Sequence, residues 1–374
     1  MSEDLLRTWV GRLDALRGWN PLLHLTVLTG FNANTDLVRR VDEQGLRSVI
    51  RSLPPEVREE LQGRLSRRGS TEVLLGPGFV EGLLAHGPFE ERPGGQAALV
   101  GELLSGADGH PAPVHGEDGS GKHFVFEFGG SSGGRLILSC SPPLVPPDAA
   151  VTQRAVDAGL DAAFLAGFHR MAPDAIRACT RHLLKLRAAQ VPIHLELTAM
   201  GPAARAAIPG LVALSDSLGG SEAEVRDLFG ERGEMGQWHS RLRTYAKENL
   251  LARIHVHLDG VQMAVTDSSP EEERRALLLA SKGAAEAARF GTLRPTLRED
   301  VPFREEDIAR YAAVVDALGG DPETGFVGAD TVLVPSPKVE SPARVVGLGD
   351  ILSAVAFLAR SRHLKGRAPD GIVE

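Results

Sequence analysis

The stretch "DAAFLAGFHRMAPDAIRACTRHLLKLRAAQVPIHLEL" (161–197) decides the fold class, because a helical pattern separates two short apolar runs. The same alternation continues with "RIHVHL" (253–258) and "DTVLVP" (330–335), each followed by a helix or a loop. Short apolar strands that alternate with helices are typical of a parallel sheet with right-handed crossovers. We therefore expect an α/β domain in which helices flank a parallel sheet.

Part of the chain does not follow this alternation. "KHFVFEF" (122–128) alternates with period two, and "RLILSC" (135–140) is a second short strand, so the pair predicts a β-hairpin. Residues 42–68 carry two helical patterns divided at two prolines. We expect these segments to form a smaller, discontinuous domain, next to a Gly/Pro-rich flexible connector at 106–121. The predicted division assigns 1–35, 94–113 and 146–374 to the large domain, and 36–93 and 114–145 to the small one.

Composition excludes several classes of function. The chain of 374 residues has a formal net charge of −8 and no Lys/Arg block interleaved with aromatic residues, so a nucleic-acid or membrane partner is not indicated. The first residues carry acids where a secretory signal carries cations, and Cys140 and Cys179 form no close pair. We expect a cytoplasmic protein, monomeric or a small homo-oligomer, with small-molecule partners.

Three motifs suggest chemistry that their context does not support. Residues 116–122 match the phosphate-loop spacing, but His123 stands where a hydroxyl is needed and a strand follows instead of a helix. Residues 129–133 match G-x-S-x-G, again between strands. His255 and His257 share one face of a strand, but no third metal ligand is indicated.

"GLGD" (347–350) places two glycines and an aspartate before an apolar helical run. A helix that begins at Asp350 leaves its first amide groups unpaired, and glycine lets an anion approach them closely. Such an anion hole suits phosphoryl transfer, with Asp350 accepting the proton of the attacking hydroxyl. The alternative is that Asp350 only caps the helix.

Further polar clusters lie at predicted strand-to-loop junctions. "GFNANTD" (30–36) carries Asn and Asp side chains that suit the hydroxyls of a sugar, and "RPGGQAAL" (92–99) opens a helix with a glycine pair and an amide. His194 and Glu196 share one face at the end of a strand, where an open α/β sheet places its ligands and where a lone carboxylate suits a water-rich Mg²⁺ site.

Together these segments resemble the ADP-dependent glucokinase and phosphofructokinase family, in order and approximate spacing, from about residue 22 to 358. The resemblance implies a three-layer α/β/α ribokinase-like domain, a smaller β-rich lid that closes over the sugar, and ADP as phosphoryl donor with Mg²⁺. It rests on "GFNANTD", "GGQAALVGEL", "AAFLAGFH", "IHLEL", "DSLGGSEAEV", "RIHVHLDG" and "VLVPSPKVESPARVVGLGD".

The resemblance also implies roles for single residues. Asp350 corresponds to the catalytic base, and the preceding three residues to the anion hole for the phosphoryl group, namely Gly347, Leu348 and Gly349. The implied sugar-binding residues are Asn34, Asp36, Gly95, Gln96 and His169. The acidic residues implied to hold Mg²⁺ through water are Glu196 and Glu222.

The acceptor sugar is predicted from one further carboxylate. Glucose-preferring members resemble one another in a glutamate before the "GGQ" segment, and Glu72 lies at about that distance. A carboxylate there binds a free hydroxyl and repels a sugar phosphate, which favours glucose over fructose 6-phosphate. A 6-phosphofructokinase, for which Lys122, Arg135 and Arg170 are the candidate phosphate ligands, and a non-catalytic nucleotide- or sugar-binding regulator remain alternatives. Two departures from the family pattern bear on the donor, Ser221 in place of Asn and Val345 in place of Thr.

Overall fold

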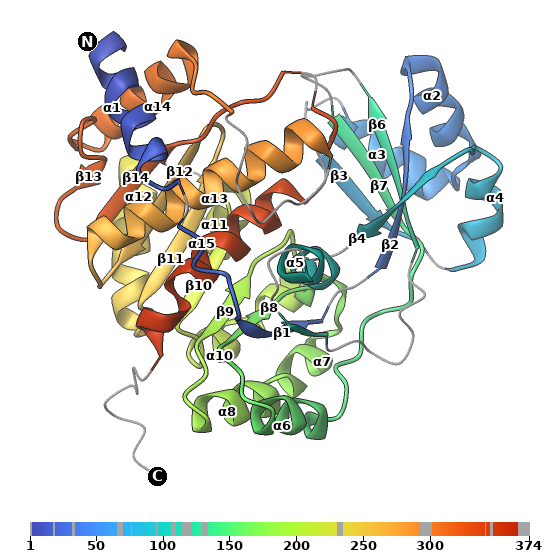
Figure 1. Cartoon of the computed structure of the whole chain (residues 1–374). Coiled ribbons are helices and arrows are strands. Elements are labelled where there is room, and N and C mark those ends of the chain that lie inside the picture. The colour runs from blue at the N-terminus through green and yellow to red at the C-terminus, as the bar shows by residue number, and fades with distance from the viewer. Residues whose placement is uncertain are drawn as a thin grey trace.

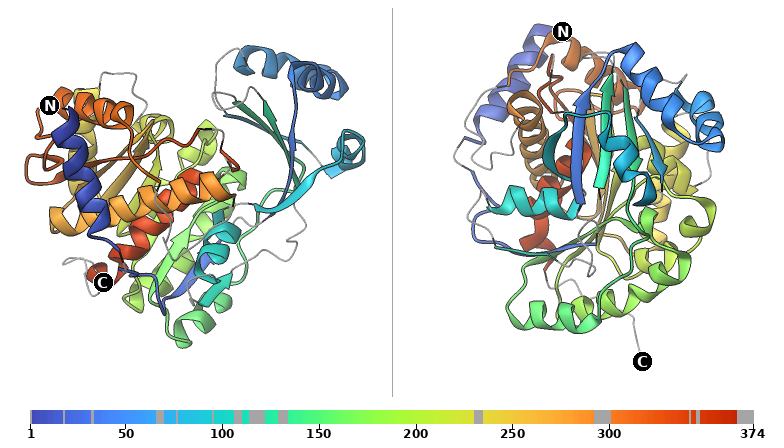
Figure 2. Two further views of the ribbon diagram at one scale, coloured as in Figure 1. Left: turned by 45° about the horizontal axis from the view of Figure 1, so that its top comes forward. Right: turned by 90° about the vertical axis from the view of Figure 1, so that its right-hand side faces the viewer.

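Two separate β-sheets organise the chain, and each has its own hydrophobic core (Figure 1). Within the computed structural model, the larger sheet is covered by helices and the smaller one stands beside it (Figure 2). The structure describes residues 2–17, 19–31, 34–65, 70–75, 77–94, 96–105, 110–113, 122–128, 134–229, 235–291, 301–340, 342–344 and 347–365.

The larger sheet has nine strands. Their spatial order is β13 (Phe326–Val327), β14 (Thr331–Pro335), β12 (Val261–Thr266), β11 (Arg253–Leu258), β10 (Ser217–Ser221), β9 (Ile193–Glu196), β8 (Ala162–Leu165), β1 (Thr26–Gly30) and β5 (His110–Pro113). The strands from β11 to β5 are all parallel, as expected for strands joined by helical crossovers. The α/β fold class predicted from the sequence is confirmed.

The other edge of this sheet differs from the expectation of parallel strands. β12 follows β11 after the two-residue turn Asp259-Gly260 and pairs with it in antiparallel fashion, and β14 is antiparallel to β12. Gly260 has φ +76°, the left-handed conformation that such a tight hairpin turn requires. The prediction that 330–335 pairs as a parallel strand was therefore wrong. It was also wrong to describe all of 106–121 as a connector, because His110–Pro113 forms the edge strand β5.

Helices cover both faces of the larger sheet. The crossovers from β8 to β11 all run in one direction, so their helices lie on one face. These are α7 (Pro173–Ala178), α8 (Thr180–Ala188), α9 (Pro202–Arg205), α10 (Pro209–Val212), α11 (Glu222–Phe229) and α12 (Met235–Glu248). The opposite face carries α5 (Gln96–Ser105), α13 (Pro270–Phe290) and α15 (Leu348–Leu364), which pack on one another (Figure 1). The remaining helices of this domain are α1 (Ser2–Asp14), α6 (Ala149–Asp157), α14 (Glu305–Ala317) and the 3₁₀ turn η3 (Phe168–Arg170).

The smaller sheet and its helices form what we call the small domain. Its strand order is β3 (Ser70–Leu74), β7 (Gly134–Ser139), β6 (Lys122–Phe128), β2 (Asn34–Arg40) and β4 (Glu90–Gly94). The predicted hairpin is confirmed, because β6 and β7 pair in antiparallel fashion. The helices that cover this sheet are α2 (Glu43–Ser52), α3 (Pro55–Leu65), η1 (Pro77–Phe79) and α4 (Val80–Leu84).

The alternation of side chains along these strands gives the small sheet two different faces. Phe124, Phe126, Leu136 and Leu138 are buried in the core of the small domain. The residues between them point to the opposite face, toward the large domain. The chain passes between the domains after β1, β4, β5 and β7, so the small sheet is held over the larger domain at several points (Figure 2).

Within the described residues, no helix combines the length and the apolar character needed to cross a membrane.

Candidate active site

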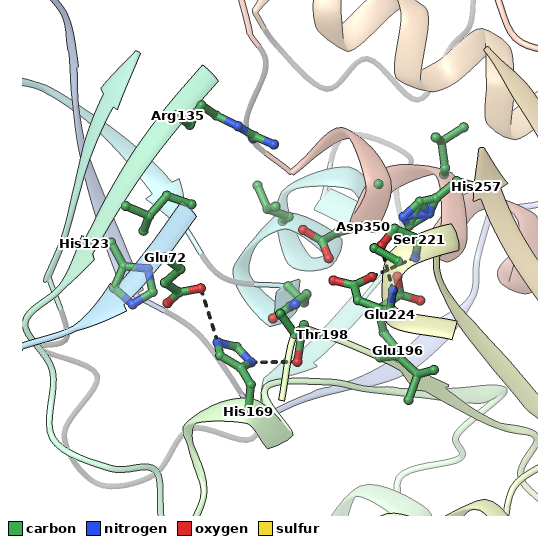
Figure 3. A pocket seen from close by; sticks show the side chains of 18 of the residues that line it. Glu72, His123, Arg135, His169, Glu196, Thr198, Ser221, Glu224, His257 and Asp350 are labelled. Atoms are coloured by element: carbon green, nitrogen blue, oxygen red, sulfur yellow. Dashed lines mark hydrogen bonds and ion pairs between the residues drawn. The ribbon is translucent and has the colours of Figure 1, made fainter. Parts of the chain in front are cut away.

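A cavity of about 570 Å³ lies between the small sheet and the large domain (Figure 3). It opens where β9, β10 and β11 end, at the carboxyl edge where open α/β sheets bind their ligands. Its walls combine residues that lie far apart in the sequence. The polar residues that line it are Asp36, Glu72, Gln96, His123, Arg135, His169, Glu196, Thr198, Ser221, Glu224, His257 and Asp350.

The small domain contributes one wall through alternate residues of its strands. His123 and Val125 on β6 and Arg135 and Ile137 on β7 line the cavity, while their neighbours in the sequence fill the core of the small domain. Glu72 on β3 lies opposite Ile137 in the strand register, so it belongs to the same face. The period-two pattern that predicts the hairpin therefore also brings these polar side chains into the site.

The N-terminus of α15 forms the facing wall. Gly347 is the N-cap residue, with φ +75°, and a Cβ atom there would overlap Leu99. A Cβ atom on Gly349 would lie 2.7 Å from Nε2 of His257. Both positions therefore require glycine, which leaves the first amide groups of the helix open to an anion.

Asp350 does not cap this helix. Helix α15 begins at Leu348 and its cap is Gly347, so Asp350 lies within the first turn and not at the start, where the sequence placed it. Its carboxylate lines the cavity and receives a hydrogen bond from Gln96. Burial raises the pKa of Asp350 to about 6, and the nearby negative charge of Glu224 adds to the effect. A carboxylate with such a pKa can accept a proton from a hydroxyl near neutral pH.

Two more carboxylates lie beside Asp350. Glu196, at the end of β9, is buried and its Oε2 lies 3.0 Å from Nε2 of His194. Burial raises the pKa of Glu196 well above its ordinary value, and the charges of Asp350 and Glu224 contribute. Burial also raises the pKa of Glu224. The three acids thus repel one another, and a cation bound among them would relieve that repulsion.

Glu224, and not Glu222, is the acid of α11 that lines the cavity. Glu222 lies one position into α11 and pairs with Arg226 at 2.7 Å, along the helix surface. Glu224 accepts a hydrogen bond from the Ser221 backbone at 2.7 Å, while its own backbone N–H donates to Oγ of Ser221. This reciprocal capping box turns the Glu224 side chain back to the strand end.

Glu72 and His169 meet across the cavity, one from each domain (Figure 3). The two atoms Glu72 Oε2 and His169 Nε2 lie 3.8 Å apart, and Nδ1 of His169 lies 2.8 Å from the Thr198 hydroxyl. Burial alone would raise the pKa of Glu72, but the histidine outweighs it and the pKa falls to about 2. Oε1 of Glu72 is buried and has no hydrogen-bond partner among the described residues. It is a ready acceptor for a hydroxyl donor.

The structure brings most of the predicted site residues together. Leu348 is half-buried and packs on the large core, so only its backbone can serve the anion hole. Gly95, Val345 and the side chain of Asn34 lie outside the described residues. The loops 116–121 and 129–133, which hold the phosphate-loop and G-x-S-x-G matches, also lie outside them, and β6 follows the former as expected.

Sequence reasoning did not assign three of the polar residues of the cavity to the site, namely Glu224, Thr198 and His257. Glu224 has a readable signal, because S-x-x-E before an apolar run indicates a capping box. Thr198 has none, since a single Thr beyond a strand is common. His257 lies on β11 and was considered in the sequence only as a metal ligand with His255. The pair His255 and His257 is not a metal site: Nε2 of His255 lies 3.1 Å from Oε1 of Gln262, and burial lowers the pKa of His257 to about 4.

The donor set suits a magnesium ion that keeps most of its water. Within the described residues, no three His, Cys, Asp or Glu side chains converge closely enough to hold a metal. Mg²⁺ commonly keeps several waters and binds through one or two carboxylates together with the phosphates of its substrate. Glu196 and Glu224 fit that arrangement, because each is an acid whose raised pKa a nearby cation would lower.

Comparison with known proteins agrees with this geometry. The sequence profile of the "ADP-specific Phosphofructokinase/Glucokinase conserved region" matches residues 147–359. The chain belongs to this family. It is therefore an ADP-dependent sugar kinase. Two curated relatives named ADP-dependent glucose/glucosamine kinase, from Pyrococcus abyssi and Pyrococcus furiosus, are each 24% identical to it; the matches cover 87% and 89% of this chain and 90% and 93% of the relatives.

Solved structures of similar fold include ADP-dependent kinases. An ADP-dependent kinase in complex with fructose 6-phosphate and ADPβS has a TM-score of 0.78 at 21% identity, with 98% of this chain and 99% of that chain covered. A hypothetical ADP-dependent phosphofructokinase from Pyrococcus horikoshii has a TM-score of 0.70 at 18% identity, with 92% and 99% covered. At these identities the similarity to solved structures shows the fold alone. The preferred sugar must be argued from the residues that line the cavity.

Proposed function

We propose that the chain transfers the β-phosphoryl group of ADP to the 6-hydroxyl of a hexose, most favourably glucose, giving glucose 6-phosphate and AMP. The supporting observation is the charge of the acceptor cavity. Among the described residues that line it, Asp36, Glu72, Glu196, Glu224 and Asp350 are acidic, whereas Arg135 is the one Arg or Lys. A sugar phosphate brings a further dianion into this surrounding, and a neutral or cationic sugar does not.

The two other candidate phosphate ligands do not face the cavity. Arg170 is buried, with Nη2 3.0 Å from the Pro142 carbonyl and Nη1 3.2 Å from Nε2 of His123. Lys122 does not line the cavity. A bound phosphate dianion usually needs several cationic or amide donors. The curated relatives' name includes glucosamine, and a protonated 2-amino group would also suit this acidic wall.

The residues act in the transfer as follows. Glu72 and Asp36 accept hydrogen bonds from sugar hydroxyls and hold the acceptor. Asp350 takes the proton of the 6-hydroxyl while the hydroxyl oxygen forms a bond to the β-phosphorus of ADP. The bond from that phosphorus to the bridging oxygen breaks, and AMP leaves. The open amides of Gly349 and its neighbours at the start of α15, together with Arg135, stabilise the charge on the transferred group. Glu196 and Glu224 would hold Mg²⁺ through water, and the ion would supply charge neutralisation on the donor phosphates.

The test is formation of AMP from ADP, measured by chromatography with glucose, glucosamine or fructose 6-phosphate as acceptor. Each sugar is also tested with ATP, with Mg²⁺ present throughout. We expect kcat/KM for glucose with ADP to exceed that for fructose 6-phosphate by about 100-fold or more. The reverse order would make the chain a phosphofructokinase. A folded protein that phosphorylates none of the sugars with either nucleotide would support the alternative of a non-catalytic regulator.

A further inference from the structure

His123 stands at the position where the phosphate-loop match fails, and its side chain is buried in the wall of the cavity, 6% exposed. It lies on β6 directly opposite Asp36 on β2, so the two side chains share the cavity face of the small sheet. Its Nδ1 lies 3.7 Å from Oδ1 of Asp36, and Asp36 is itself only 3% exposed. The ring is therefore a direct cross-strand neighbour of Asp36, a proposed sugar ligand; the other is Arg92 on β4.

The other ring nitrogen faces the large domain. Nη1 of Arg170, on the turn η3, lies 3.2 Å from Nε2 of His123. The guanidinium is held in place by the Pro142 carbonyl, and the Arg170 backbone carbonyl accepts a hydrogen bond from the Leu144 backbone at 2.9 Å. Turn η3 is thus fixed to the segment that returns from the small domain, which makes Arg170 a rigid donor.

The chemistry of Arg170 determines the tautomer of the ring. A guanidinium has five N–H donors and no acceptor, so Nε2 of His123 must be the acceptor of this hydrogen bond. The ring is neutral, because burial lowers the pKa of His123 to about 4 and the positive charge of Arg170 lowers it as well. A neutral ring that accepts at Nε2 carries its proton on Nδ1, toward Asp36.

We propose that His123 is a positioning residue for the acceptor sugar: Arg170 holds it as the Nδ1–H tautomer, and the dipole of that N–H, 3.7 Å from Oδ1 of Asp36, orients the carboxylate toward the sugar hydroxyls. Nε2 of the ring then accepts from Arg170, and Nδ1–H faces Asp36. The relay Arg170, His123, Asp36 joins the large domain to the small one, so the orientation of the sugar ligand depends on their contact. This proposal rests on the proposed function.

Three variants and a control test the relay. His123→Phe keeps a planar ring but no N–H, and we expect the Kd for glucose, measured by titration calorimetry, and the KM for glucose to rise about 10-fold or more. His123→Asn offers both an N–H and a carbonyl, so it should remain within about 3-fold of the wild type. Arg170→Met should raise both constants by a smaller factor. Arg177, an exposed arginine of α7 that pairs with Asp174, supplies the control Arg177→Met.

The KM for ADP should change by less than about 2-fold in all four variants, which separates loss of sugar orientation from general damage to the fold. ¹⁵N NMR of the labelled imidazoles supplies a readout that is independent of turnover. The His123 signals, identified by their loss in His123→Asn, should show the Nδ1–H tautomer in the wild type and a mixture in Arg170→Met.

The outcomes distinguish the relay from the proposed function. An Nε2–H tautomer in the wild type, or an unchanged glucose Kd in His123→Phe, would overturn the relay even if the enzyme phosphorylates glucose. A wild type that binds glucose but transfers no phosphoryl group would overturn the proposed function, while weaker glucose binding by His123→Phe would still support the relay.

Discussion

Nε2 of His257 occupies the space that a side chain on Gly349 would need, because a Cβ atom there would lie 2.7 Å from it. The neutral imidazole thus packs against the first turn of α15, beside the amide groups that are proposed to form the anion hole. An alanine at 349 must displace the ring or the first turn of the helix, and either shift moves the amides that are proposed to hold the phosphoryl group.

We expect Gly349→Ala to lower kcat about 100-fold. The matched control is Gly236→Ala in α12, where a Cβ atom meets nothing within 4 Å. Alanine should there stabilise the helix by about 0.5–1 kcal/mol without affecting turnover. Steady-state kinetics and thermal melting of both variants check the prediction, and equal activities would show that the close contact has no role in catalysis.

Asp350→Asn should lower kcat by about 10³-fold or more while the KM for glucose stays within a few-fold, because the base is lost but the sugar ligands remain. The same change should stabilise the fold at pH 8. The folded-state pKa is raised to about 6, so the ionised carboxylate disfavours folding once the pH rises above the unfolded value. We expect the free energy of unfolding, from urea titration, to increase by about 1–3 kcal/mol at pH 8 and to be unchanged at pH 3.

The pH dependence of kcat/KM for glucose should show an acidic limb with a midpoint near pH 6. Asp350 must be ionised to accept a proton, so the rate should fall as the pH drops below its pKa of about 6. The residual activity of Asp350→Asn should lack this limb. A limb that persists in the variant would instead belong to Glu196 or Glu224, whose pKa values are also raised.

The two acids at the start of α11 should differ in their effect on magnesium dependence. Glu224→Gln should raise the Mg²⁺ concentration at half-maximal rate about 10-fold, because a neutral amide replaces a carboxylate that is proposed to hold the ion through water. Glu222→Gln changes an acid of the same helix that pairs with Arg226 outside the cavity, and should have no effect. If both variants needed the same Mg²⁺ concentration for half-maximal rate, the proposed role of Glu224 in holding the ion would be contradicted.

Glu72→Gln should raise the KM for glucose about 10-fold, since the carboxylate with an unpaired buried oxygen becomes a weaker acceptor. It should also narrow the preference for glucose over fructose 6-phosphate by removing a repulsive charge. Glu91, exposed on β4, provides the control Glu91→Gln. An unchanged ratio of kcat/KM for the two sugars would remove Glu72 from sugar selection.

The sequence predicted the α/β fold, the hairpin and several of the polar residues that line the cavity, for physical reasons that act locally. Apolar periodicity reports which face of an element is buried, and glycine pairs report where a backbone must stay open. This is why Asp350, Gly347 and Gly349 could be singled out from four consecutive residues.

What could not be predicted depends on partners distant in sequence. Whether a carboxylate of α11 enters the cavity is decided by the capping box that turns Glu224, and not Glu222, toward Ser221. The engagement of Arg170 by Pro142 and His123 removes it from the phosphate-ligand candidates, and no local pattern reports that contact. The antiparallel edge of the large sheet did have a local signal, because Asp259-Gly260 is a typical hairpin turn. The alternation of strands and helices elsewhere in the chain favoured a parallel strand instead.

The position of α15 has a consequence for biosynthesis. This late helix lies against α13, α5 and strands β8 to β11, in the middle of the large core. A growing chain on the ribosome must therefore hold its earlier strands and helices with an unfilled groove until α15 emerges and packs there. Because the same helix carries Asp350, the step that completes the core is also the step that brings this carboxylate to the cavity.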